Sequence, residues 1–330
     1  MSALTPKTGG TKFGPYTIYE RLGQGGMCLV FRARREDAAY DCALKVLRQD
    51  QRSDERVLDL FITEADLSLL LEHPNLIRTY EAGEVQGRYY IAMELMQGGT
   101  LGELLRECTR RQVRLPQDFA LYVVSEILEG LHSLHTAEGA TGRELGLIHR
   151  DITPHNIFLA FDGRVILGDF GVALIQAYGD NSPGEVLGKL GYLAPEMVSM
   201  EEVDRRADIF AAGVVLYELL TGTRMFDGKD EETVLADIAE AKFPRPRKVR
   251  ESISRALELV LLKALARRPK DRFETAEEML YALEPLWSRQ VGSPYALAAL
   301  LSAVYPDRAH AWRAEHQLLA ESLDGRPFKS

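Results

Sequence analysis

The chain has 330 residues, of which 46% are apolar and 27% charged. This length and apolar content are enough for a globular protein with about two lobes of ordinary domain size. The formal net charge is -9 at pH 7. We therefore expect neither nucleic acid nor an anionic membrane as the main partner, because both require a dominant basic surface.

Targeting signals and cysteines indicate the compartment. No apolar run approaches the roughly 20 residues needed to cross a bilayer, and residues 1–6 lack the regions of a signal peptide. Cys28, Cys42 and Cys108 are an odd number without metal-ligand spacing, so neither a disulfide framework nor a zinc site is indicated. We expect a reduced, cytoplasmic protein with no membrane-inserted segment.

The first elements along the chain predict a small lobe rich in strands. Residues 1–12 are polar and rich in Gly and Thr, so we expect a flexible arm, with order starting near Phe13. Residues 16–46 are rich in β-branched and aromatic side chains broken by glycines, which predicts antiparallel strands. Residues 54–72 have helical apolar spacing, and residues 77–93 alternate as two further strands.

The remainder of the chain predicts a mainly helical lobe. Gly98 and Gly99 break the pattern, so we place the lobe boundary there and expect an N-lobe of residues 13–96 and a C-lobe of residues 97–289. Helical patterns cover residues 117–135, 207–221 and 275–286, with short strands at 157–159 and 165–167. Residues 290–330 form a C-terminal helical extension, interrupted at Pro306.

Two features of the first lobe suggest a phosphate site. The segment Gly23-Gln24-Gly25-Gly26-Met27-Cys28 lies between strands, where glycines let backbone N–H groups approach phosphate oxygens; a plain turn is the alternative. Lys45 lies in an apolar strand, where its ammonium needs a compensating anion. Glu64 on the following helix is the natural partner, although a lysine at a strand end is more often a solvated charge.

The most informative segment is His149-Arg150-Asp151-Ile152-Thr153-Pro154-His155-Asn156, which is followed by an apolar strand and then by Asp169-Phe170-Gly171. Together with the glycine loop, Lys45, Glu64 and Ala194-Pro195-Glu196, these elements match the H-R-D-x-x-x-x-N, D-F-G and A-P-E motifs in order. Over residues 13–286 the sequence resembles the protein kinase family, most closely its eukaryotic-like bacterial Ser/Thr members.

This resemblance implies an α+β, two-lobed protein kinase fold that binds ATP between a small antiparallel lobe with one helix and a larger, mainly helical lobe. It implies that Asp151 orients a protein hydroxyl and takes its proton, while Asn156 and Asp169 bind Mg²⁺, or Mn²⁺, through oxygen. Lys45, held by Glu64, is expected to contact the α- and β-phosphates. The implied nucleotide-binding residues are Leu22, Gly23, Gln24, Gly25, Gly26, Met27, Cys28, Val30, Ala43, Lys45, Met93, Glu94, Met96, Phe158 and Asp169.

The resemblance also implies structural roles. Glu196 and Arg272 look like the buried ion pair that anchors the segment after the activation loop. Asp208 looks like the helix carboxylate that steadies the catalytic loop.

Three positions depart from the family pattern. Thr153 stands where Ser/Thr kinases usually place a lysine that reaches the γ-phosphate, and Lys189 stands where a threonine usually contacts that lysine. Our hypothesis is that Lys189 restores the missing charge from the opposite side of the pocket; the alternative is drift at both positions. Cys28 replaces the third glycine of the loop, from which we expect weaker nucleotide binding; an oxidation-sensitive thiol is a further alternative.

The acceptor and the regulation are less well indicated. Pro154 fits the Ser/Thr pattern, and Thr100 and His155 stand where arginine-directed kinases often carry acids, so we expect Ser/Thr acceptors without a strong upstream-arginine preference. Ser182 is the sole candidate autophosphorylation site between Gly171 and Ala194, with a plain turn residue as the alternative. The expected partners are protein substrates and an upstream kinase or regulator.

Two other functions compete with this reading. A pseudokinase that binds nucleotide without efficient transfer is motivated by Thr153 and Cys28. The retention of Lys45, Asp151, Asn156 and Asp169 argues against it. A small-molecule phosphotransferase shares the chemistry but generally lacks the Ala-Pro-Glu segment and the glycine loop.

Overall fold

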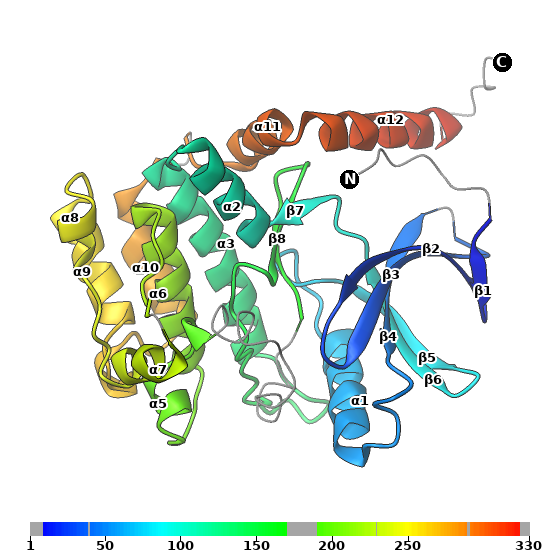
Figure 1. Cartoon of the computed structure of the whole chain (residues 1–330), viewed down its shortest axis with the longest axis horizontal. Helices are drawn as coiled ribbons and strands as arrows, with labels where there is room; N and C mark the ends of the chain where they lie inside the picture. Colours follow the sequence, from blue (N-terminus) through cyan, green and yellow to red (C-terminus); the bar gives the residue numbers. More distant parts are fainter. Residues whose placement is uncertain (1–8, 39, 170–189, 229, 289–290, 324–330) are drawn as a thin grey trace.

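The first part of the chain folds into an antiparallel sheet with the strand order β1-β2-β3-β4-β6-β5 (Figure 1). A computed structural model describes residues 9–38, 40–169, 190–228, 230–288 and 291–323. The strands are β1 Thr11–Phe13, β2 Tyr16–Gln24, β3 Cys28–Arg35, β4 Asp41–Leu47, β5 Thr79–Val85 and β6 Arg88–Glu94. All residues of β4 are buried, because apolar clusters cover both faces of the sheet at this central strand.

Helix α1, Glu55–Leu70, is the one helix among the described residues of this lobe and matches the predicted amphipathic segment. Asp54 caps its start by accepting hydrogen bonds from two backbone amides of the first turn. Phe61 and Ala65 pack against Cys28 in one apolar cluster, while Glu64 is buried on the same face. The helix is therefore fixed to the sheet by the face that carries Glu64.

The ordered part of the N-terminus begins earlier than we predicted. Thr11 and Lys12, which we assigned to a flexible arm, belong to β1 and pair with Ile18 and Thr17 of β2. The polar sequence of this short segment did not indicate a strand. The segment is nevertheless ordered, because pairing with the longer β2 satisfies its backbone N–H and C=O groups.

We predicted that Gly98 and Gly99 interrupt the regular structure, but they belong to a strand, β7, Gly98–Thr100. This strand pairs with β8, Ile157–Ala160, which pairs in turn with β9, Val165–Leu167. A side chain at position 98 would place its Cβ 1.8 Å from the carbonyl oxygen of Leu159. The glycine is therefore required by close strand packing and not by a turn.

The second lobe is mainly helical, which confirms the two-lobed α+β prediction. Its helices are α2 Leu101–Arg111, α3 Gln117–His135, α5 Pro195–Val198, α6 Arg206–Thr221, α7 Glu231–Ala239, α8 Pro246–Val249, α9 Arg255–Ala264 and α10 Ala276–Leu283, with 3-10 turns at Pro269–Asp271 and Glu284–Leu286. Helix α6 lies at the centre and its residues 207–221 are all buried. A helix that is apolar on every side can only be stable in such a place.

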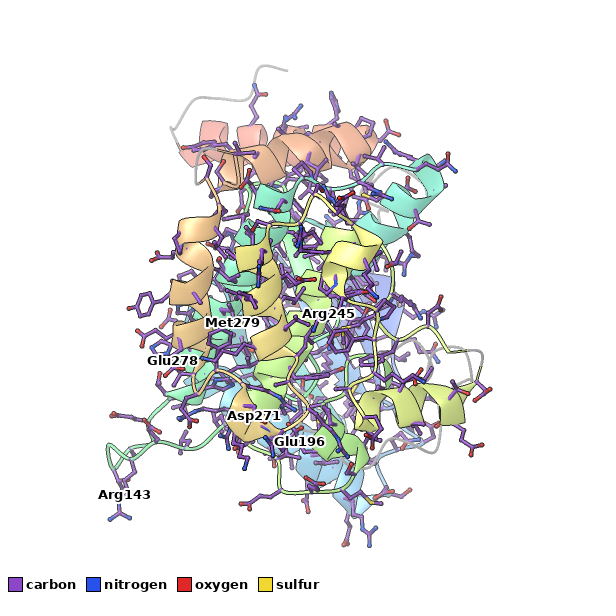
Figure 2. All side chains as sticks on the ribbon, turned by 90° about the vertical axis from the view of Figure 1, so that its left-hand side faces the viewer. Arg143, Glu196, Arg245, Asp271, Glu278 and Met279 are labelled. Atoms are coloured by element: carbon purple, nitrogen blue, oxygen red, sulfur yellow. The ribbon has the colours of Figure 1, made fainter. Side chains whose placement is uncertain are left out.

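Between α3 and the catalytic motif, residues 137–145 form a loop that we did not predict. It is closed by backbone hydrogen bonds from Gly139 to Arg143, 2.9 Å, and from Leu145 to Ala137, 2.8 Å. Arg143 lies at its tip and projects away from the rest of the lobe (Figure 2).

The C-terminal extension consists of α11, Pro294–Val304, and α12, Pro306–Leu323. Tyr305 leaves the helical conformation, as expected for a residue that precedes proline, so the predicted interruption at Pro306 is confirmed. In Figure 1 the two helices lie across the top of the second lobe, and α12 runs past β7 toward the first sheet. Within the described parts of the chain, we find no helix with the length and apolarity to cross a membrane.

Candidate active site

A buried carboxylate accepts hydrogen bonds from the backbone of the catalytic motif. Asp208 on α6 accepts hydrogen bonds from the backbone amides of His149 and Arg150, each 2.8 Å, and lies 2.8 Å from His135 Nε2. Burial opposes ionisation of Asp208, but His135 and the amide of Arg150 outweigh this effect and keep its pKa below the usual value. Asp208 therefore contacts the catalytic loop as the resemblance implied.

Two residues of the motifs adopt left-handed backbone conformations. The φ angle is 67° at Arg150 and 53° at Asp169, in a region that residues with a side chain rarely occupy. Such conformations cost free energy and persist where the surroundings fix them, which is common at functional sites. In this structure they turn the chain on both sides of β8 and β9.

Asp151 and Asn156 are in direct contact. Asn156 Nδ2 donates to Asp151 Oδ2 over 2.7 Å and to the carbonyl oxygen of Asp151 over 3.0 Å. The amide of Gly168 donates to the carbonyl of Asn156 over 2.9 Å, which joins this loop to Asp169. Because the amide nitrogen of Asn156 faces Asp151, its side-chain oxygen is the group that can face a metal ion.

Lys45 is shared between two carboxylates. Its Nζ lies 2.6 Å from Glu64 Oε1 and 2.9 Å from Asp169 Oδ1. Burial would lower the pKa of Lys45, but Asp169 and Glu64 outweigh this effect and hold it well above the usual value. The ammonium is therefore charged, and it joins β4 to α1 and to Asp169.

Asn156 and Asp169 offer the oxygen donors that we assigned to Mg²⁺. The Asp169 side chain is 46% exposed, so it is accessible to an ion. Nowhere in the described ranges do three His, Cys, Asp or Glu side chains form a metal-binding group. This donor set fits Mg²⁺, which commonly takes one or two protein oxygens together with phosphate and water, better than a metal held by protein alone.

The glycine loop connects β2 and β3. A Cβ at Gly23 would meet no atom within 4 Å, and one at Gly25 would only reach the carbonyl oxygen of Cys28 at 4.0 Å. These two glycines are therefore not required by packing inside the protein. Their small size fits the approach of a ligand, in agreement with a phosphate site.

Cys28 does not face the space over the loop. It is 5% exposed and packs against Phe61 and Leu47 on the side of α1. Burial raises the pKa of its thiol to about 12. Because a reactive cysteine needs an accessible thiolate, the alternative of an oxidation-sensitive thiol is wrong, and Cys28 is a packed small side chain.

The residues assigned to the adenine come together from several strands. Val30 stands opposite Lys45, and Ala43 stands opposite Met93, in neighbouring pairs of the first sheet. Phe158 on β8 is half-buried on the side of the second lobe. The other assigned residues are Leu22 and Gln24 at the end of β2, Gly26 and Met27 between β2 and β3, all exposed or half-buried, and Glu94 and Met96, half-buried at the junction of the lobes.

Residues 94–97 link β6 to β7, and we call this segment the hinge. The amide of Glu94 donates to Arg78, and its side chain pairs with Arg164 over 2.7 Å. Met96 makes no backbone hydrogen bond with any residue that the structure describes. Since half-buried backbone groups are normally paired, those of Met96 can serve a ligand such as adenine.

Thr153 is 2% exposed, and its hydroxyl has no hydrogen-bond partner among the described residues. Lys189, which we paired with it, lies outside those residues, as do Phe170 and Ser182. His155 is exposed beside Arg106, whose Nη1 lies 3.2 Å from His155 Nε2.

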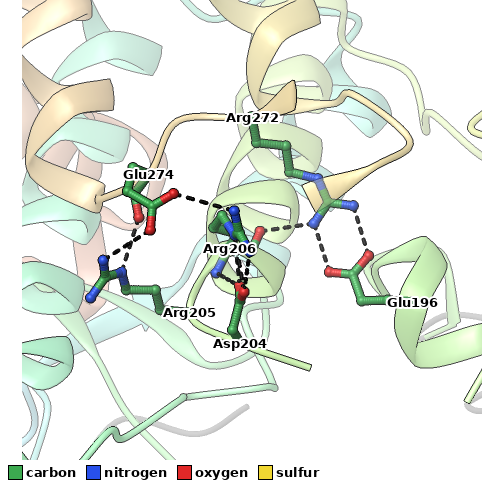
Figure 3. Close-up of polar contacts among 6 residues, drawn as sticks. All are labelled: Glu196, Asp204, Arg205, Arg206, Arg272 and Glu274. Atoms are coloured by element: carbon green, nitrogen blue, oxygen red, sulfur yellow. Dashed lines mark hydrogen bonds and ion pairs between the residues drawn. The ribbon is translucent and has the colours of Figure 1, made fainter. Parts of the chain in front are cut away.

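Glu196 and Arg272 form the buried ion pair that the resemblance implied (Figure 3). Two parallel contacts of 2.7 Å join the guanidinium to the carboxylate, and both side chains are almost fully buried. Arg272 also donates to the backbone carbonyls of Arg206 and Ala266. The pair fixes the Ala-Pro-Glu segment to the base of α6.

Tyr192 and Glu218 were missed by the sequence analysis. The Tyr192 hydroxyl donates to Glu218 Oε2 over 2.6 Å in a buried setting, and burial raises the pKa of Glu218 to about 7. An acidic residue inside an otherwise apolar helix was the signal that could have pointed to this contact.

A cavity of about 300 Å³ lies elsewhere, on the first sheet beside Tyr40, Tyr80 and Glu81. None of the motif residues lines it. We therefore assign the nucleotide site from the motif geometry and not from this cavity.

Comparison with known families decides the classification. The family model described as protein kinase domain matches residues 16–282. The chain belongs to the protein kinase family. Its catalytic, glycine-loop and D-F-G motifs lie within that range.

Two curated kinases and one solved structure illustrate the similarity. Tyrosine-protein kinase MasK of Myxococcus xanthus is 35% identical over 314 residues, 93% of this chain and 49% of MasK, so this match must reach into residues 290–330. Serine/threonine-protein kinase PrkC of Bacillus subtilis is 33% identical over 267 residues, 81% of this chain and 39% of PrkC. The chain thus spans about half the length of these relatives, or less.

The fold comparison agrees. The kinase domain of PknI from Mycobacterium tuberculosis superimposes with a TM-score of 0.64 at 27% identity, covering 86% of this chain and 99% of the PknI domain. The kinase fold expected from the motifs is therefore confirmed.

Proposed function

We propose that this kinase domain transfers the γ-phosphoryl group of ATP to serine or threonine hydroxyls of proteins, including its own. The proposal depends on two hydrogen bonds between motif residues: Asn156 donates to Asp151, and Lys45 donates to Asp169. The likeness to other protein kinases supports it. A pseudokinase role has no support beyond Thr153, since Cys28 packs away from the loop.

The proposed roles follow from charge and reach. Asp151 accepts a hydrogen bond from the acceptor hydroxyl, whose oxygen forms the new bond to the γ-phosphorus as the bond to the β-phosphate oxygen breaks. The hydroxyl proton passes to the Asp151 carboxylate, and ADP leaves. Lys45, positioned by Glu64, neutralises the α- and β-phosphates. Mg²⁺, held by Asn156 and Asp169, supplies further neutralisation of the phosphate charge when bound; Mn²⁺ has the same donor preference.

Thr153 supports a role for Lys189. A buried hydroxyl without a partner is unfavourable, and a donor from another segment removes that cost. We propose that Lys189 supplies the positive charge at the transferred phosphate, in place of the lysine that other Ser/Thr kinases carry at position 153.

The acceptor residue needs its own test, because one relative is named a tyrosine kinase and the other a serine/threonine kinase. Pro154 favours Ser/Thr acceptors. The neighbour of His155 is the basic Arg106, which would not attract an arginine upstream of the acceptor in the substrate. Transfer of labelled phosphate to itself and to a generic protein substrate, followed by phosphoamino-acid analysis, decides this. We expect phosphoserine or phosphothreonine; phosphotyrosine alone would refute the assignment.

We further propose a kinase domain that begins with β1 and ends at residue 289, with the lobe boundary between residues 96 and 97, and an extension of residues 290–330. A cytoplasmic location, protein substrates, an upstream kinase or regulator, and phosphorylation of Ser182 complete the proposal. Phosphopeptide mapping after incubation with ATP and Mg²⁺ tests Ser182.

A further inference from the structure

The C-terminal extension is part of the core of the second lobe. Leu297 and Leu301 of α11 and Ala309 of α12 are buried in the same apolar cluster as α3 and α6. The ring of Trp312 lies 6.0 Å from that of Phe161, which follows β8. In Figure 1, α12 lies above β7 and extends over the first sheet.

Arg308 reaches from α12 to the point where the chain leaves the hinge. Its Nη2 donates to the carbonyl oxygen of Gly98, and its Nη1 lies 3.2 Å from Glu103 Oε2. The Tyr305 ring supports the guanidinium, with 5.0 Å from Cζ to the ring centroid. The guanidinium is a planar fork of donors, so it can hold a carbonyl and a carboxylate together, which a single ammonium cannot do in the same geometry.

Both partners of Arg308 lead to the proposed adenine site. Gly98 begins β7, and Thr100 at the end of that strand stands opposite Phe158, one of the residues expected to bind the nucleotide. Glu103 and Thr100 form a capping box that starts α2. Arg308 thus contacts the strand and the helix start that follow the hinge.

We propose that Arg308 is a positioning residue for the nucleotide. By holding Gly98 and Glu103 it fixes β7 against β8, and so sets the spacing between the hinge backbone at Met96 and the ring of Phe158. Arg308 touches no substrate and acts only through these elements. The inference rests on the proposed function, because it requires ATP to bind at the hinge.

The test compares the wild type with Arg308→Ala, Arg308→Lys and Arg313→Ala. Arg313 lies on the same helix, and among the side chains that the structure describes it donates to Ser302 Oγ of the extension at 3.0 Å. Arg313→Ala therefore removes the same charge and side chain without touching β7 or α2. The measurements are the Kd of Mg–ADP by calorimetry, the KM for ATP with kcat, the melting temperature, and hydrogen exchange of residues 97–104.

Arg308→Ala is expected to raise the Kd of ADP and the KM for ATP about three- to tenfold, with kcat nearly unchanged and faster exchange over residues 97–104. Arg308→Lys is expected to fall between Arg308→Ala and the wild type, and Arg313→Ala to match the wild type. An unchanged Kd in Arg308→Ala with a lower melting temperature, or an equal effect in Arg313→Ala, overturns the inference.

The two proposals can fail separately. If the wild type binds ADP in an Arg308-dependent way but transfers no phosphate, the proposed function fails and the positioning role stands. If the wild type transfers phosphate while ADP binding is independent of Arg308, only the positioning role fails. A wild type that binds no nucleotide overturns both.

Discussion

The ammonium of Lys45 lies 2.6 Å from the carboxylate of Glu64, across the interface between β4 and α1. Both side chains are buried, so each needs the other to compensate for lost hydration. Asp169 shares the same ammonium at 2.9 Å. The position of α1 on the sheet is thereby coupled to the position of the Asp169 side chain.

We predict that Glu64→Gln lowers kcat/KM by about 100-fold, because a misplaced Lys45 no longer aligns the phosphates. Stability should fall by only about 1–3 kcal/mol, since Lys45 keeps Asp169 as a partner. Steady-state kinetics and urea denaturation measure both effects. Asp66→Asn, an exposed change on the same helix, is the control; equal loss of activity in the two variants would contradict the account.

The Glu196–Arg272 pair should dominate the stability of the second lobe. Glu196→Gln leaves the buried guanidinium without its charge partner, and we predict a loss of about 3–5 kcal/mol in urea denaturation. Glu274→Gln, which removes an exposed partner of Arg206 at 3.2 Å, should cost less than about 1 kcal/mol. Similar losses in both variants would show that burial of the pair does not matter.

Glu218 predicts a specific dependence of stability on pH. Its pKa is raised by burial to about 7 in the folded protein, from 4.5 as its ordinary value, so the folded state binds the proton more tightly. Stability from this group is therefore complete below pH 4.5 and is lost as the pH rises toward 7, by at most about 3 kcal/mol. From about pH 4.5 to 8, the unfolding free energy of the wild type should therefore fall relative to that of Glu218→Gln. A difference that is independent of pH contradicts it.

Lys189→Ala should reduce kcat by about 100- to 1000-fold if Lys189 supplies the charge missing at position 153. Adding Thr153→Lys to that variant should recover part of the activity, since it restores the usual position of the cation. Full activity in Lys189→Ala would favour unrelated drift at both positions.

The motifs allowed much of the site to be predicted from the sequence. Phosphoryl transfer restricts the residue types at Lys45, Asp151, Asn156 and Asp169, and their order along the chain constrains the fold. The helix capped by Asp54 and the break before Pro306 were also predictable, because capping and proline geometry are local properties.

Contacts between distant segments could not be predicted in the same way. Gly98 read as a chain break because its role depends on the carbonyl of Leu159, which approaches only after β8 is formed. Arg308 and Gly98 are 210 residues apart, and no local pattern relates them. Cys28 suggested a perturbed loop because the sequence does not tell which face of the strand it occupies.

We propose that Asp151 takes the proton of a protein hydroxyl during transfer from ATP. The most direct measurement is transfer of labelled phosphate from ATP with Mg²⁺ by the wild type and by Asp151→Asn, together with the affinity of each for Mg–ADP. We predict transfer by the wild type, loss of at least about 100-fold in Asp151→Asn, and equal ADP affinity in both. Absence of transfer by the wild type, or undiminished transfer by Asp151→Asn, would contradict the account.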